Sequence, residues 1–131
     1  MPDKTTSYEE LIPGYSFPPA SYELTASVVA KYLKAVDGGG DGFVPPLAVT
    51  ALAIATMAGS IPLPPGVVAI HGSQELEFFK VVPVGTIVEC HTKVAQKIAR
   101  GKMTMLAMEL EVLDQARERV QSGKATIALL T

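Results

Sequence analysis

Phe43 to Gly59 reads FVPPLAVTALAIATMAG, and this stretch decides the fold of the chain. It carries no charged side chain, and Thr50 and Thr56 are its only polar side chains. Pro45 and Pro46 suit the first turn of a helix, where a backbone N–H has no helical partner to lose. Alanine and leucine favour the helix body, and the final glycine can end it. A helix that is apolar all round is predicted to be buried on every side.

This helix is too short to cross a bilayer comfortably. At about 14 residues and about 1.5 Å per residue it would span roughly 21 Å, less than the roughly 30 Å hydrocarbon core. The segments that follow must therefore wrap around it. We expect Leu52 and Ile54, in its middle, to lie in the core, where truncation to alanine would be costly.

The chain after this helix has the period of strands. From Val67 onward apolar and polar residues alternate, as expected where one face of a sheet is buried. Gly123 is a candidate β-bulge in the last strand. The predicted strands are Val67–Val82 (with a kink at His71-Gly72), Thr86–Ala99, Gly101–Leu113 and Arg119–Leu130.

The chain before the helix adds one short strand and one helix. The strand is expected near Tyr15–Tyr22, and Thr25 is a favourable N-cap for the helix. The run from Asp37 to Gly42, DGGGDG, ends that helix, because neither helix nor strand tolerates it. The order strand, helix, buried helix and antiparallel meander predicts an α+β fold, with a curled sheet around the central helix. At 131 residues, one domain is expected for 1–131.

Composition excludes several classes of function. The chain is 48% hydrophobic and 18% charged, and its mean hydropathy of +0.30 predicts that apolar surface is buried against another subunit. A net charge of −2 leaves no basic footprint for nucleic acid. Neither a signal-peptide core nor a membrane-spanning run is evident, so a cytoplasmic protein without membrane contact is expected. Two histidines and the single Cys90, widely spaced, predict no metal site, and no cofactor is expected.

Several stretches resemble known proteins. Gln74 to Thr86, QELEFFKVVPVGT, resembles the strand-turn-strand of hotdog-fold proteins that act on acyl thioesters, and Gly123 to Leu129, GKATIAL, resembles their closing strand. Three pieces resemble MaoC-like hydratases and dehydratases more narrowly. These pieces are Tyr22-Glu-Leu-Thr25, Val44-Pro-Pro-Leu47 and His71-Gly-Ser-Gln74. The last of the three is similar to a motif in the N-terminal, non-catalytic repeats of double-hotdog members.

The resemblance implies a hotdog fold and a chemistry. Members of that family add water to trans-2-enoyl thioesters or remove it from (R)-3-hydroxyacyl thioesters. Their active repeats carry an Asp and a His before the central helix, typically as Asp-x-Asn-Pro-x-His. The matching loop here, Asp37 to Pro45, has acids but no histidine, and the chain contains no asparagine. The pair that would deprotonate water and protonate the Cα atom is therefore missing.

Six residues remain as candidates for the site. His71, at the kinked strand, and Asp41, in the glycine-rich loop, are the catalytic candidates. A histidine at a kink that bonds to the backbone, and an aspartate that shapes a turn, are the plainer interpretations. The start of the central helix, Val44 and Leu47, could polarise a thioester carbonyl with free N–H groups. Gly72 and Ser73 are the other expected substrate contacts.

Three functions stay open. In the first, the chain is a hotdog subunit for acyl-CoA or acyl carrier protein that shapes the acyl tunnel while a partner brings the Asp/His pair. In the second, it is a self-sufficient hydratase or acyl-CoA thioesterase that uses Asp41 or His71. In the third, it is a non-catalytic module that binds acyl thioesters. The expected assembly is a homodimer, or a heterodimer with a catalytic hotdog subunit. The edge strand from Val67 to Phe79 would form the contact.

Overall fold

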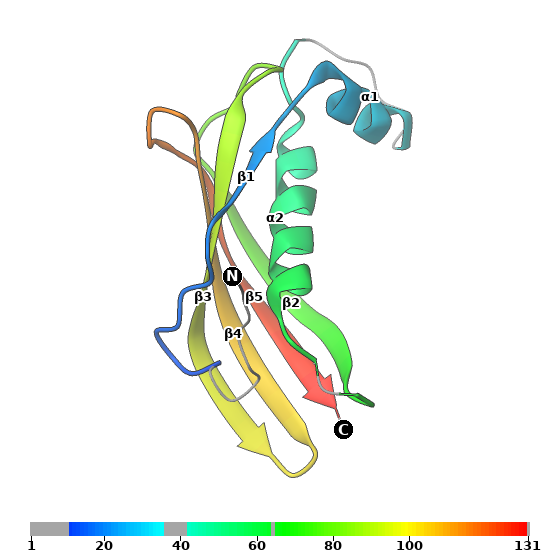
Figure 1. The fold of residues 1–131 in the computed structure, drawn as a ribbon, viewed down its shortest axis with the longest axis vertical. Coiled ribbons are helices and arrows are strands. Elements are labelled where there is room, and N and C mark those ends of the chain that lie inside the picture. The colour runs from blue at the N-terminus through cyan, green and yellow to red at the C-terminus, as the bar shows by residue number, and fades with distance from the viewer. Residues whose placement is uncertain (1–10, 36–41, 64, 131) are drawn as a thin grey trace.

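The computed structural model describes residues 11–35, 42–63 and 65–130. In these ranges five antiparallel strands form one sheet in the order β1-β3-β4-β5-β2. The sheet curls along one side of α2, and α1 projects near the end where α2 begins (Figure 1). This is the α+β arrangement that the sequence predicts. The elements are β1 Ala20–Glu23, α1 Ala26–Ala35, α2 Pro46–Ser60, β2 Val68–Phe78, β3 Ile87–Arg100, β4 Met103–Leu113 and β5 Arg119–Leu130.

The core lies between α2 and the concave side of the sheet. α2 buries Ala48, Val49, Thr50, Ala53 and Met57. They meet the inward side chains of the long strands, because alternate strand residues point to the same face. Two clusters of buried apolar residues result, one under each half of the helix. The inward residues of β3 and β4 include Val88, Cys90, Val94, Leu106, Met108 and Val112.

The helix is not buried on every side, so that prediction is wrong for the single chain. Its exposed residues are spaced by about one helical turn and are small or apolar. Leu52 and Ile54, expected in the core, are only half-buried. One sheet covers one side of a helix, and the opposite side stays open. The exposed residues are Pro46, Leu47, Ala51, Ala55, Ala58 and Gly59.

The start of α2 is fixed by the segment between β2 and β3. The Val44 N–H donates to Val82 O over 2.8 Å, and the Val84 N–H donates to Gly42 O over 3.1 Å. These two bonds make a short antiparallel pairing just before Pro46. The place where α2 begins is therefore set by the sheet.

Strand β2 is an edge strand with a break in its register. It pairs with β5 on one side, and the register shifts between His71 and Ser73, which confirms the kink at Gly72. The strand ends at Phe78, earlier than predicted. At the other edge of the sheet, β1 covers less than the predicted strand, and Ser16 makes only an isolated bridge to Lys93.

Gly123 is not a bulge. It lies in continuous register between Leu76 of β2 and Leu110 of β4. A Cβ atom there would lie 2.6 Å from the backbone oxygen of Glu75, inside van der Waals contact. The glycine is needed because β2 approaches β5 too closely at this point for a side chain to fit.

We expect Met57→Ala to lower the free energy of unfolding by about 2–5 kcal/mol, because Met57 is fully buried and its loss leaves a cavity. Leu47→Ala, on the exposed side of the same helix, should cost about 0.5 kcal/mol or less. Urea unfolding of both variants measures the difference. Equal losses for the two would mean that α2 packs differently from this description.

Gly123→Ala should destabilise the chain by about 1–3 kcal/mol, because the added methyl group must push β2 away from β5. Gly72→Ala is the matched control, since a Cβ there meets only Thr126 O, at an ordinary 3.5 Å. Thermal unfolding compares the two. A wild-type melting temperature for Gly123→Ala would contradict the close approach.

Candidate functional site

The structure separates the expected site residues into two groups. His71, Gly72 and Ser73 are exposed at the bulge of β2. Val44 and Leu47 lie at the start of α2, where Val44 is buried and the Leu47 side chain is 56% exposed. Asp41, the second catalytic candidate, lies outside the described residues, as does Asp37.

These two groups do not meet within one chain. Phe78 at the end of β2 pairs with Gln121 of β5, and the Gln121 amide bonds to Pro46 O at the start of α2. His71 lies seven positions earlier on β2, which is roughly 20 Å at about 3.3 Å per residue. A substrate carbonyl held at the start of α2 is therefore out of reach of His71 in the same chain.

The start of α2 offers one backbone donor above all. Pro45 and Pro46 have no N–H, and the Ala48 N–H donates to Pro45 O over 2.9 Å. Leu47 thus carries the first N–H of the helix, and a first-turn N–H has no carbonyl partner within its helix. The helix dipole favours negative charge at this end. An oxygen that gains negative charge during a reaction would be stabilised here.

Sequence reasoning missed a buried polar pair next to this donor. Gln121 on β5 is 3% exposed and Thr50 on α2 is 6% exposed. The Thr50 hydroxyl donates to Gln121 Oε1 over 2.7 Å, and Gln121 Nε2 donates to Pro46 O over 2.6 Å. The signal was available in the sequence. Counting back by twos from Leu129, Ile127 and Ala125, which are all buried, places Gln121 on the inner face of β5.

The space between α2 and the sheet is nearly closed. A cavity of about 10 Å³ lies below the first turns of the helix. Most of its lining residues are apolar, and the polar ones are Thr50, Gln121 and Ser122. The residues that line it are Thr50, Ala53, Leu76, Leu110, Val112, Gln121, Ser122 and Gly123.

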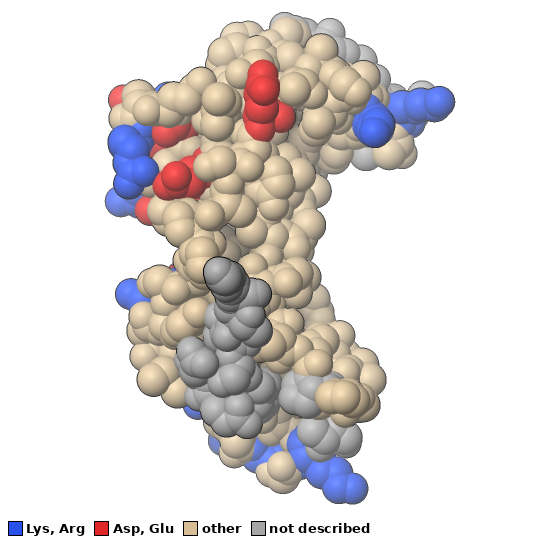
Figure 2. Space-filling view, in the orientation of Figure 1, with Lys and Arg blue, Asp and Glu red and all other residues tan. Residues whose placement is uncertain are grey.

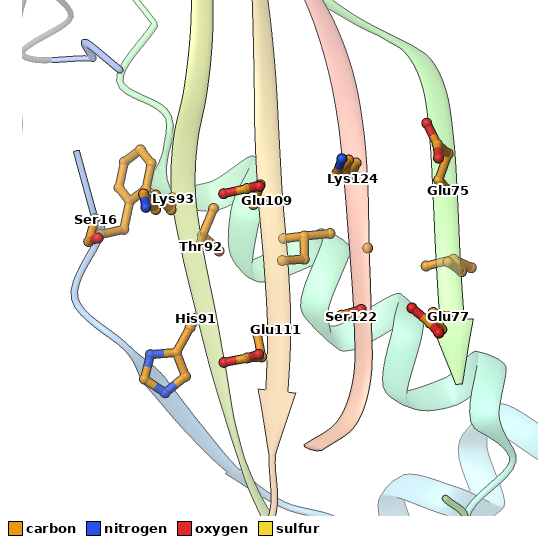
Figure 3. A pocket seen from close by; sticks show the side chains of 14 residues that line it. Ser16, Glu75, Glu77, His91, Thr92, Lys93, Glu109, Glu111, Ser122 and Lys124 are labelled. Carbon is orange, nitrogen blue, oxygen red and sulfur yellow. The ribbon is translucent and has the colours of Figure 1, made fainter. Parts of the chain in front are cut away.

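A larger groove of about 680 Å³ crosses the sheet on the face away from α2 (Figure 3). Its side chains come from adjacent strands and alternate in charge: Lys93 opposes Glu109, Glu109 opposes Lys124, and Lys124 opposes Glu75. Such cross-strand pairs stabilise a solvated sheet face. The groove therefore has a structural explanation.

His91 lies on this outer face. Its Nε2 is 2.6 Å from Glu89 Oε1, and Arg117 Nη1 donates to the same oxygen over 3.1 Å. The imidazole is thus part of a partly exposed hydrogen-bond network on the charged outer face of the sheet. It lies on the opposite side of the sheet from the start of α2, so it is not a candidate for that site.

Metal and thiol chemistry find little support in the parts of the chain that the structure describes. No group of three or more His, Cys, Asp or Glu side chains there could hold a metal ion. Cys90 is buried beneath α2, and burial raises the pKa of its thiol to about 11. A thiol of that pKa is protonated at neutral pH and is a poor nucleophile. None of the described helices is long and apolar enough to span a membrane.

Comparison with known proteins establishes the fold. No family model and no curated protein matches the chain. Among solved structures, it is similar to the R-hydratase PhaJ1 from Pseudomonas aeruginosa, with a TM-score of 0.78 and 21% identity over 92% of this chain and 83% of that one. A MaoC-like dehydratase from Rhodospirillum rubrum has a TM-score of 0.78 and 18% identity, over 93% of this chain and 94% of that one. A Streptococcus mutans protein bound to acetyl CoA has a TM-score of 0.62 and 13% identity, over 90% of this chain and 83% of that one.

This chain has the hotdog fold. Its structural neighbours include MaoC-like hydratases and dehydratases, as the sequence motifs imply. Identities of 21% or less carry the similarity no further than the fold. The resemblance to a non-catalytic repeat stays a prediction.

An ion-pair cluster holds the segment that positions α2. Lys80 Nζ donates to Asp114 Oδ2 over 2.5 Å and to Glu118 Oε1 over 2.8 Å. Lys80 lies two residues before Val82, whose carbonyl accepts from Val44. The hydrogen bond from Lys80 is the main reason why the pKa of Asp114 is lowered below its ordinary value of 3.8, with a further contribution from the Glu118 backbone N–H.

This cluster should make stability depend on pH in the acid range. A carboxyl whose pKa is lower in the folded chain contributes stability above its unfolded pKa and loses it as the pH falls through the folded pKa. We expect Lys80→Met to melt below wild type at pH 6, and the gap to shrink as the pH falls from about 4 to about 2. Lys31→Met, on exposed α1, is the control. A gap that stays constant down to pH 2 would contradict the assignment.

Proposed function

We propose that this chain binds acyl thioesters, of CoA or of acyl carrier protein, as a MaoC-like hotdog subunit. The observation that carries the proposal is the start of α2, where the free Leu47 N–H stands at the positive end of an uncharged helix in a hotdog fold. The hydratase neighbours and the neighbour bound to acetyl CoA support it. In this role the chain holds and polarises the thioester carbonyl and shapes the acyl tunnel.

The acid–base pair would come from elsewhere. Hydration of an enoyl thioester needs one group to deprotonate water and one to protonate Cα. The loop from Asp37 to Pro45 has no histidine. Because His71 is roughly 20 Å along β2 from the start of α2, it cannot fill that place within the same chain. A catalytic hotdog partner with an Asp/His pair would complete the enzyme, and His71, Gly72 and Ser73 would reach only a substrate held by another chain.

The surface around α2 fits such a partner. Figure 2 shows few charged atoms over α2, whereas charged side chains lie on the left side of the view, near α1 and at the lower end of the molecule. The adjoining edge strand β2 and the residues after it expose large apolar side chains, which otherwise favour burial. These are Val68, Ile70, Leu76, Phe78, Phe79 and Val81.

The open side of α2 and the apolar edge of β2 together offer a surface for one partner, and a standard interface buries about 800 Å² per partner. We infer that a second hotdog chain, a copy of this one or a catalytic partner, covers the open side of α2 and pairs with the edge of β2.

The test uses the pure chain with crotonyl-CoA. We expect binding, but no loss of the enoyl absorbance and no release of free thiol, because each missing acid–base group costs about 10²–10⁴-fold in rate. Leu47→Pro, which removes the N–H, should weaken binding, whereas Leu47→Ala, which keeps it, should not. Circular dichroism checks that both variants fold.

Each other outcome identifies a different function. Loss of the enoyl absorbance would mean a self-sufficient hydratase, and His71→Ala and Asp41→Ala would then locate its acid and base. Release of thiol would mean an acyl-CoA thioesterase. Absence of binding to crotonyl-CoA would overturn the proposal.

A further inference from the structure

Gln121 is an unusual side chain for the core of this protein. It is 3% exposed, and it lies on a face of β5 that is otherwise occupied by glycine, alanine, isoleucine and leucine. The other polar residues buried among the described residues are all threonines: Thr50, Thr86 and Thr92. A leucine would fill a similar volume without the cost of burying an amide.

Both polar ends of the Gln121 amide have partners. Its Oε1 accepts from the Thr50 hydroxyl over 2.7 Å, and its Nε2 donates to Pro46 O over 2.6 Å. A satisfied buried network adds little net stability compared with an apolar replacement, but it can fix one geometry among several. Here the geometry fixed is that of the first turn of α2 against β5.

The bonded carbonyl belongs to the same peptide group as the Leu47 N–H. Pro46 C=O and Leu47 N–H are the two polar ends of one planar trans unit, so they point in opposite directions. A hydrogen bond that holds the carbonyl toward Gln121 therefore aims the N–H away from it, out of the start of the helix. Donation to the carbonyl also polarises the peptide and strengthens its N–H as a donor.

We propose that Gln121 is a positioning residue for the acyl-thioester site, acting through the rigid Pro46–Leu47 peptide to aim the Leu47 N–H at the thioester carbonyl. The inference rests on the proposed function, and it adds the device by which the core sets the carbonyl-binding donor. Thr50 orients the Gln121 amide, because its hydroxyl donates a hydrogen bond that Oε1 can accept and Nε2 cannot.

The test compares two ligands that differ only at the carbonyl. Butyryl-CoA is a thioester, and S-butyl-CoA is the thioether without the oxygen. In calorimetry the wild-type chain should prefer the thioester by roughly fivefold, the effect of one net hydrogen bond. Gln121→Leu should bring this ratio close to one. Gln96→Leu, the same substitution at an exposed position of β3, should leave the ratio unchanged.

A purely structural role predicts a different pattern. If Gln121→Leu weakens the binding of both ligands equally, or of neither, the fivefold ratio of affinities is preserved. That result would overturn the inference. If Gln121→Leu does not fold, Thr50→Val replaces it, because that change removes the bond to Oε1 with little change of volume, and the same two outcomes apply. A wild-type chain that binds neither ligand would overturn the proposed function, and this inference with it. A wild-type chain that binds both ligands equally would leave acyl-CoA binding intact, but it would overturn the contact between the Leu47 N–H and the thioester carbonyl, and the role of Gln121 with it.

Discussion

The structure depends on the burial of one uncharged helix. α2 has no charged side chain to keep it in water, so it must be covered, and a single curled sheet covers only one of its sides. Ala53 and Met57 pack against that sheet, while Ala51 and Ala55 face outward. The wrapping strands, the apolar edge of β2 and the proposed second chain all follow from the need to cover this helix.

The two threonine side chains of α2 fix its position within that apolar surrounding. Thr50 bonds to Gln121 on one side, and Thr56 lies 2.6 Å from the Tyr22 hydroxyl of β1 on the other. Each threonine hydroxyl also lies within hydrogen-bond distance of the carbonyl four residues earlier, as buried threonines in helices often do. Apolar packing is non-directional, so these bonds can set how α2 is rotated and where it starts. Through these bonds the core sets the position of the start of α2, where the candidate site lies.

The sequence predicted the helix and the faces of the strands because these depend on local periodicity. The exposure of Leu52 and Ile54 was not predictable in the same way, since an apolar helix does not reveal how many layers cover it. Gly72 and Gly123 look alike in a strand pattern, but only the pairing register shows that one marks the bulge and the other a close approach. The separation of His71 from the start of α2 likewise depends on long-range register. Gln121, by contrast, was within reach, because the phase of β5 places it inside.

Sedimentation equilibrium of the pure chain at micromolar concentration tests the central claim most directly, because the claim is that a second chain must cover the open side of α2 and the edge of β2. We expect a particle of twice the 13.8 kDa chain mass. A stable monomer of 13.8 kDa, unfolding cooperatively with the surface of α2 open to water, would contradict it.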